Sequence, residues 1–242
     1  MEKLGIADAP QTAPTRGARR KSETRRRLLR AARAVFAREG LENATIAQIT
    51  READVGFGTF YLHFATKEEA YRAVVTDGFG ELAGLLGQAH TEAMARGAPW
   101  WELARDGVRA YCAFAERNRE LFLVMFAGGS AGIGLGRELQ ERFAGLLAAQ
   151  LAEAATSARA HGQPAPYPYP AQPVALATVV ALTRSVLWWL DQDEQDEDAH
   201  TAARPTLDAL VEALTRFLTA ALWGQTPTAA PQPLATEGND PR

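Results

Sequence analysis

Residues 45–67, TIAQITREADVGFGTFYLHFATK, decide how this chain folds, because they contain two short helical patterns separated by a turn. Thr45 and Gln48 match a T-x-x-Q capping box. In such a box the threonine hydroxyl accepts from a first-turn N–H and the glutamine reaches back to the cap residue. Ile49 and Ala53 follow at helical spacing on one face. The first half of the stretch is therefore predicted to be a short, capped helix.

The second half of the stretch predicts a tight turn and another helix. Asp54 tolerates the left-handed backbone that a tight turn can need, and Gly56 is an acceptable N-cap. The second helix is expected over residues 58–63. Thr66 and Glu69 then repeat the capping pattern at the start of a longer helix. The whole stretch is predicted to be a helix-turn-helix followed by a third helix.

A strongly basic segment precedes this pattern. Its cations, all within residues 15–30, are Arg16, Arg19, Arg20, Lys21, Arg25, Arg26, Arg27 and Arg30. Residues 1–72 hold 14 Lys and Arg against 9 Asp and Glu, whereas the whole chain has a net charge of −3. An arginine run alone is usually a solvated face. A helix-turn-helix beside such a run is typical of proteins that hold duplex DNA.

Residues 22–75 resemble the DNA-binding domain of the TetR family of bacterial transcriptional regulators. The resemblance rests on a helix ending at Gly40-Leu41, the Thr45-Ile46-x-x-Ile49 helix start, and GTFYLHFATKEE at residues 58–69. It implies an all-α fold, with an N-terminal three-helix helix-turn-helix domain and a larger helical domain for ligand binding and dimerisation. It also implies that Tyr61, His63 and Lys67 mainly contact phosphates or position the helices. The expected DNA-binding residues are Thr45, Gly58, Thr59, Tyr61, His63, Lys67, Arg19 and Arg20.

Two positions depart from the pattern of that family. Phe57 and Leu62 stand where polar, DNA-facing side chains are common. Neither a phenyl nor an isobutyl group makes the bidentate contacts that read guanine or adenine, so each can only meet a thymine methyl or exclude water. Base readout is therefore expected to rest on few side chains, with phosphate contacts or DNA shape supplying the rest.

The rest of the chain is predicted to be helical, without strands or repeats. Its expected helices cover residues 66–88, 99–116, 118–127, 134–160, 173–190 and 204–222. A Pro- and Tyr-rich linker at 162–173 and an acidic loop at 191–198 interrupt them. We expect a disordered basic arm at residues 1–20, the helix-turn-helix domain at 21–65, an effector-binding and dimerisation domain at 66–223, and a disordered tail at 224–242.

The last two expected helices are predicted to form a homodimer interface. Helix-turn-helix proteins usually dimerise so that their two heads reach half-sites about one DNA turn, ~34 Å, apart. The TetR resemblance implies that these two helices pair with their symmetry mates. The residues expected in this interface are Ala181, Leu207, Leu210, Leu214 and Phe217. The alternative, that both helices only fill the core of one chain, stays open.

The middle helices carry more aromatic residues than packing needs. Ligand pockets are commonly apolar, with a few polar groups that orient the ligand. For any one aromatic residue a place in the core is the plainer interpretation, but the set predicts a site for a small apolar or aromatic effector. The residues expected around this site are Trp100, Trp101, Arg109, Phe114, Phe122, Phe126, Phe143 and Trp188.

Other functional classes find little support in the sequence. The four histidines are scattered, Cys112 has no evident partner, and no nucleophile motif or zinc spacing occurs, so no catalytic residue, metal or cofactor is expected. A single cysteine suits a reducing cytosol. The apolar stretch 174–190 contains Arg184 and is short for a membrane span. We therefore expect a cytoplasmic protein with no membrane partner.

The sequence thus predicts a sequence-specific transcriptional regulator. We expect a repressor that leaves its double-stranded DNA operator when a small-molecule effector binds. Two alternatives stay open: a constitutive DNA-binding or architectural protein without a ligand, and a helical enzyme.

Overall fold

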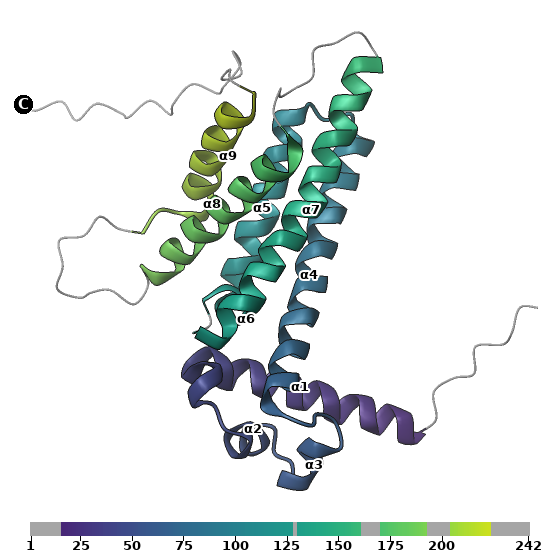
Figure 1. Cartoon of the computed structure of the whole chain (residues 1–242), viewed down its shortest axis with the longest axis vertical. Helices are drawn as coiled ribbons and strands as arrows, with labels where there is room; N and C mark the ends of the chain where they lie inside the picture. Colours follow the sequence, from purple (N-terminus) through teal and green to yellow (C-terminus); the bar gives the residue numbers. More distant parts are fainter. Residues whose placement is uncertain (1–15, 128–129, 161–169, 193–203, 224–242) are drawn as a thin grey trace, which may run out of the picture. The chain divides into compact units, whose positions relative to one another are not determined.

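The computed structural model describes residues 16–127, 130–160, 170–192 and 204–223, and every regular element in these ranges is an α-helix (Figure 1). This confirms the predicted all-α class. The chain divides into two compact units, Met1–Val74 and Val75–Arg242. The described helices are α1 (Arg16–Asn43), α2 (Ile46–Glu52), α3 (Phe57–Tyr61), α4 (Lys67–Ala95), α5 (Trp100–Arg117), α6 (Arg119–Phe126), α7 (Ser130–Ala160), α8 (Ala171–Asp191) and α9 (Leu207–Trp223).

The first unit is built from α1, α2, α3 and the first turns of α4. α1 packs against α2, and α2 packs against α3. Leu28 of α1, Ile49 of α2 and Phe60 of α3 are fully buried and form the centre of this core. Phe36 of α1 meets Tyr71 of α4 edge to face, with 5.1 Å between ring centroids. Ile49, which helical spacing predicted to lie on the apolar face of its helix, is therefore part of this core.

Two expected boundaries of this unit were wrong. Residues 16–20, assigned to a disordered arm, form the start of α1, because arginine, lysine and alanine are strong helix formers. The rest of that arm, residues 1–15, lies outside the described residues. The division between the units falls after Val74 instead of after residue 65, since the first turns of α4 bury Tyr71 and Val74 in the first unit.

The backbone of α1 breaks where the sequence predicted the first helix to end. Gly40 has φ 72 and ψ 168, outside the helical region. A glycine adopts this positive φ at no steric cost. Leu41 and Ala44 behind it are buried, so the break redirects the chain toward α2 without exposing apolar surface.

The second unit is a bundle made by the rest of α4 and by α5 to α9. α7 packs along α8, while α9 packs on α5 and also touches α8 (Figure 1). Phe114, Phe122 and Leu139 lie fully buried in this bundle. Gly78 brings α4 close to α6, because a Cβ at this position would lie 2.7 Å from Met125 Sδ. Any larger side chain at Gly78 would push these two helices or their side chains apart.

The last two helices differ slightly from the prediction. The last helix was expected to start at residue 204, but α9 begins at Leu207, after Pro205. Thr206 accepts from the backbone N–H of Ala209, and the Pro205 carbonyl accepts from Trp189 Nε1 at 2.7 Å. Trp189 thus ties α8 to the segment that opens α9.

α8 is the one helix in the described ranges that is long and apolar enough to cross a membrane. Half of its apolar window, 50%, is buried within the second unit. The buried positions include Ala175, Val179, Val186 and Leu190, which recur at helical spacing. This pattern is the one expected of a core helix.

Candidate nucleic-acid interface and effector region

The capping box at the start of α2 is present as predicted. The Thr45 hydroxyl accepts from the Gln48 backbone N–H at 3.2 Å, and Gln48 Oε1 accepts from the Thr45 backbone N–H at 2.8 Å. At the start of α4, Thr66 caps the Glu69 N–H at 3.1 Å, and the Glu69 carboxylate accepts from the Ala65 N–H at 2.7 Å. Both helices therefore begin at residues fixed by local hydrogen bonds.

The turn between α2 and α3 is held by a side chain that the sequence analysis did not single out. Asp54 has φ 50, the left-handed conformation expected of it, and Gly56 is the N-cap of α3. One guanidinium nitrogen of Arg27 in α1 donates to the Ala53 carbonyl at 2.7 Å and to the Asp54 carbonyl at 2.9 Å. The same nitrogen lies 3.4 Å from the Asp54 carboxylate. Arg27 thus fixes the position from which α3 starts.

A sequence signal for this role of Arg27 did exist. It is adjacent to buried Leu28, and it lies one helical turn before buried Ala31. Helical periodicity therefore puts it at the edge of the buried face of α1. Exposed neighbours such as Arg26 and Arg30 lie away from that face.

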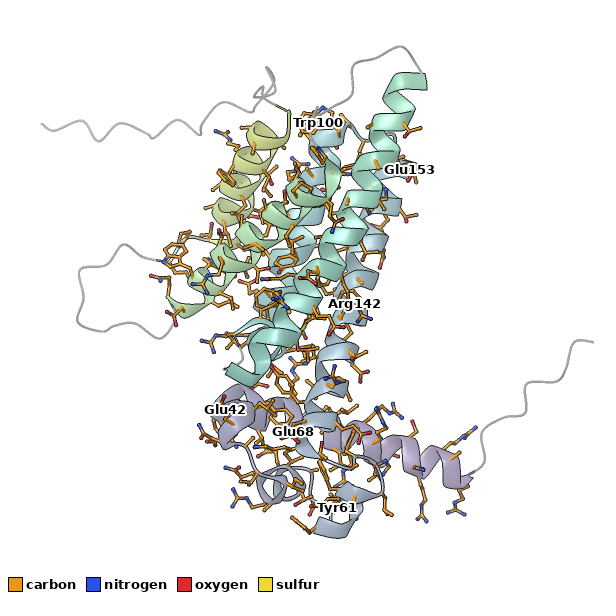
Figure 2. All side chains as sticks on the ribbon, in the orientation of Figure 1. Glu42, Tyr61, Glu68, Trp100, Arg142 and Glu153 are labelled. Atoms are coloured by element: carbon orange, nitrogen blue, oxygen red, sulfur yellow. The ribbon has the colours of Figure 1, made fainter. Side chains whose placement is uncertain are left out.

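α3 is anchored on one side and open on the other. Phe60 is fully buried, with its ring centroid 5.6 Å from that of Phe64. Gly58 is exposed, and a Cβ there would meet nothing within 4 Å. Thr59 is half-buried, whereas Tyr61 is exposed and projects from the end of α3 (Figure 2). The expected contact residues of α3 thus lie on an accessible helix held from behind by a phenylalanine.

His63 follows α3 and lies half-buried beside the basic helix. Burial lowers the pKa of His63, and the positive charges of Lys21 and Arg25 lower it further. The Arg25 guanidinium lies over the Phe64 ring, 5.1 Å from its centroid. The free domain therefore holds His63 in a setting that favours its neutral form.

Lys67 has a structural role that the sequence analysis did not include. Its ammonium donates to the Glu42 carbonyl at 2.8 Å and to the Ala44 carbonyl at 2.9 Å. These carbonyls belong to the segment between α1 and α2, so Lys67 ties the start of α4 to it. An ammonium has three donors, and two of them are engaged here. A phosphate contact by Lys67 stays a prediction.

The other expected DNA-binding residues also belong to the first unit. Arg19 and Arg20 are exposed on α1, on a helix whose polar side chains project outward along much of its length (Figure 2). Thr45 is exposed at the start of α2. One unit therefore carries both the exposed residues of α3 and the exposed arginines that were predicted to meet a phosphate backbone.

The residues expected around an effector differ in how deeply they are buried. Phe114, Phe122 and Phe143 are buried, with the Phe122 ring centroid 4.8 Å from that of half-buried Phe126. Trp100 and Trp101 are half-buried at the start of α5. The aromatic residues of α5, α6 and α7 thus occupy the interior of the second unit, with the two tryptophans at one end of α5.

Two members of that set were misplaced by the prediction. Trp188 is 54% exposed, because consecutive residues of a helix point about 100° apart and Trp189 takes the buried position. Arg109 forms an ion pair with Asp208 of α9 at 2.8 Å, with both side chains largely exposed. Neither residue therefore lies in the interior of the second unit with the buried phenylalanines.

A buried polar pair in the same region was not singled out as a site. The Tyr111 hydroxyl and Thr183 Oγ1 lie 2.8 Å apart, joining α5 to α8. Burial raises the pKa of Tyr111. Burial likewise raises the pKa of the neighbouring Cys112 thiol to about 12, so this buried cysteine is expected to be chemically inert. The polar pair is the more promising hydrogen-bonding feature of this interior.

The residues expected in a dimer interface also differ in exposure. Leu210 is buried within its own unit, so it cannot lie on an outer face. Ala181, Leu207 and Leu214 are half-buried. Phe217 is 60% exposed. The prediction for Leu210 was wrong because the buried side of α9, which packs on α5, includes this position.

Within the described ranges no group of three or more His, Cys, Asp or Glu residues is arranged to hold a metal ion. Most of the acidic loop at 191–198 and of the Pro- and Tyr-rich linker at 162–173 lies outside the described residues, as does the expected tail at 224–242.

Comparison with known proteins agrees with this geometry. Residues 28–74 match the family described as bacterial regulatory proteins, tetR family. The HTH-type transcriptional regulator SrpR of Pseudomonas putida is 45% identical over 53 residues, which cover 22% of this chain and 25% of SrpR. This chain therefore spans only a quarter of the length of that relative.

Solved structures share the fold over most of the chain. A TetR-family transcriptional regulator from Syntrophomonas wolfei has a TM-score of 0.66 at 18% identity, covering 86% of this chain and 99% of that one. RolR in complex with resorcinol has a TM-score of 0.56 at 20% identity, covering 85% and 90%. Residues 28–74 thus match the helix-turn-helix domain of the tetR family of bacterial regulatory proteins, and the fold of the described chain is that of solved regulators of this type.

Proposed function

We propose that this chain represses transcription by binding a DNA operator as a homodimer and leaves the operator when a small apolar or aromatic effector binds. The observation that carries the proposal is the exposed α3 beside the basic α1, in a domain that matches the tetR family. Such a regulator acts in the cytoplasm, where the single buried cysteine stays reduced.

Binding to DNA follows from the charges and the accessible helix of the first unit. Arg19 and Arg20 of α1 are exposed, and a protein gains affinity by releasing counterions when its cations neutralise phosphates. Phosphate contacts fix the register, while base edges are read by side chains in the groove. In this proposal α3 supplies the groove contacts through Gly58, Thr59 and Tyr61.

Dimerisation is supported by apolar side chains left exposed on α8 and α9. Leu176, Val180 and Trp188 of α8 recur at helical spacing, and Phe217 of α9 is also exposed. Exposed apolar patches mark interaction surfaces. A second copy of the chain is the occupant that a two-half-site operator requires.

Effector binding is supported by the aromatic interior of the second unit and its polar pair. Phe114 and Phe122 supply apolar surface, and the Tyr111–Thr183 pair supplies hydroxyl groups. The structural neighbour RolR is a complex with resorcinol, a small aromatic compound. An effector releases DNA only if it binds one conformation better than the other, and DNA and effector then weaken each other by the same factor.

The experiment begins with selection of bound duplexes from a random-sequence library by the full chain. A repeated, two-fold symmetric sequence is expected, bound by a dimer in sedimentation analysis. A reporter placed behind this operator should be silenced by the protein. Aromatic compounds that raise the melting temperature by mass action should lower operator affinity and restore the reporter.

The outcomes separate this proposal from a constitutive DNA-binding protein. If operator affinity stays the same with every compound that binds, the protein has no effector-driven release. If no preferred sequence emerges from the library, specific binding itself is refuted.

A further inference from the structure

Three large apolar side chains are exposed together at α3. Phe57 is 54% exposed, Tyr61 51% and Leu62 72%. Over residues 16–74, all of which the structure describes, these are the exposed large apolar side chains. The other large apolar residues of this stretch are buried or half-buried. A patch of this kind marks a surface that is covered in the working protein.

The two rings of this patch are held in place. Phe57 and Tyr61 are four residues apart on one helix, so they lie on one face. Their rings meet edge to face with 5.6 Å between centroids. Tyr61 also meets the ring of Phe60 at 5.7 Å, and Phe60 is fully buried. The exposed rings are therefore backed by the core, which lowers the entropy lost when they bind a partner.

The charge around the patch identifies its occupant as DNA. α1 of the same unit exposes Arg19, Arg20, Lys21, Arg26 and Arg30. These cations suit a polyanion. The open space beside Gly58 lets a partner approach the backbone of α3 next to Phe57.

Apolar groups in the major groove have one specific partner. Among the four bases only thymine presents a methyl group there, at C5, whereas the minor groove presents none. Guanine and adenine are read by bidentate polar side chains. None of the three residues of the patch carries such a group, since the one polar atom among them is the phenolic oxygen of Tyr61.

We propose that Phe57, Tyr61 and Leu62 form a thymine-methyl reading surface that sets the operator preference of this protein. The inference rests on the proposed DNA-binding function and deepens it by naming the residues that determine specificity. Phe57 and Tyr61 contact C5-methyl groups in each half-site, and Leu62 extends the apolar contact. Discrimination among bases by this surface therefore comes from methyl burial.

The test uses an operator duplex selected from a random library by the full chain. Each thymine is replaced in turn by deoxyuridine, which removes the methyl group and leaves the pairing edge unchanged. Burying one methyl-sized group corresponds to about a fourfold change in affinity. We expect losses of about this size at one or two thymines of each half-site, and no loss at thymines outside the contacted positions.

Variants connect these methyl groups to named side chains. The Phe57→Ala protein should bind the thymine operator more weakly and should lose the uracil effect at one position. Leu62→Gln tests the edge of the patch in the same way. The matched control is Leu146→Ala, an equally exposed apolar residue of α7, which should keep every uracil effect. The slope of affinity against salt should stay unchanged in all three, since phosphate contacts remain.

Two results would overturn the inference. If deoxyuridine at every thymine leaves affinity within twofold, or if Phe57→Ala keeps the full methyl effects, the patch does not read methyl groups, while the regulator function stands. If no preferred operator emerges from the library, the inference and the proposed function fail together. Loss of dimerisation in Phe57→Ala without any methyl effect would assign the patch to a second copy of the chain.

Discussion

Replacing Lys67 with methionine separates a role in the fold from a role at the DNA backbone. The Lys67 ammonium donates to the Glu42 and Ala44 carbonyls at 2.8 and 2.9 Å. Hydrogen bonds to a charged group contribute about 1.5–3 kcal/mol each, and less where water competes. Because Lys67 is half-buried, we expect Lys67→Met to weaken the tie between α4 and the α1–α2 segment by about 2 kcal/mol in total.

Hydrogen exchange measures this loss directly. The tryptophans of the chain all lie beyond residue 74, so their fluorescence does not report on the first unit. Amide exchange over residues 40–50 reports local opening. A change of about 2 kcal/mol corresponds to roughly 30-fold faster exchange. Operator affinity should fall as well, because α2 and α3 lose their fixed position.

Arg19→Gln is the matched control, because Arg19 is an exposed cation of α1. It should leave amide exchange unchanged and lower the salt slope of operator binding by about one unit, as expected for one lost phosphate contact. The opposite pattern at Lys67 would refute the reasoning. Exchange within threefold of the wild type, together with a salt slope lowered by one unit, would make Lys67 a phosphate contact.

Three further perturbations test other parts of the structure. A DNA phosphate should raise the lowered pKa of His63, so the complex binds more protons than the free protein. Operator affinity should therefore rise as pH falls from the pKa of His63 in the complex toward its lowered pKa in the free protein, and His63→Gln should flatten that profile in titrations. Phe217→Glu should give soluble monomers in sedimentation analysis, and a dimer of this variant would exclude the exposed face of α9 as the interface. Leu210→Glu should instead unfold the protein, because Leu210 is buried. Thr183→Val should lower the free energy of unfolding in urea by about 1–3 kcal/mol, because it leaves the buried Tyr111 hydroxyl without its partner. Tyr111→Phe should lower it by only about 1 kcal/mol, because the Thr183 hydroxyl still donates to the Val179 carbonyl; equal losses would contradict this asymmetry.

Local chemistry made the helix-turn-helix readable from the sequence. Thr45 and Gln48 cap α2 with atoms three residues apart, and Asp54 takes the left-handed conformation that its type allows. Such interactions depend only on neighbours along the chain, so they leave a fixed spacing in the sequence. The same holds for the buried face of each helix, where Ile49 and Phe60 follow helical periodicity.

The positions that the sequence misplaced depend on helix rotation and on partners distant in the chain. Trp188 and Trp189 are the same residue type at adjacent positions, so only the packing of α8 decides that Trp189 is buried and Trp188 exposed. Leu210 and Phe217 both belong to the apolar stripe of α9, but the contact with α5 buries one side of that stripe. When the apolar stripe of a helix is wider than the area in contact with its neighbour, only tertiary packing decides which of its residues are buried and which stay exposed.

The sequence by itself determined the helix-turn-helix and the all-α class, because caps, turns and periodicity act over a few residues. The resemblance to the TetR family, not these local signals, indicated that Phe57 and Leu62 face outward. Only the tertiary structure decided what the cations do. Arg27 and Lys67 looked like any other cation of a basic domain, yet their donors reach carbonyls 26 and 25 residues away. A cation bonds whichever acceptor the fold brings near it, and that acceptor leaves no mark in the sequence around the cation.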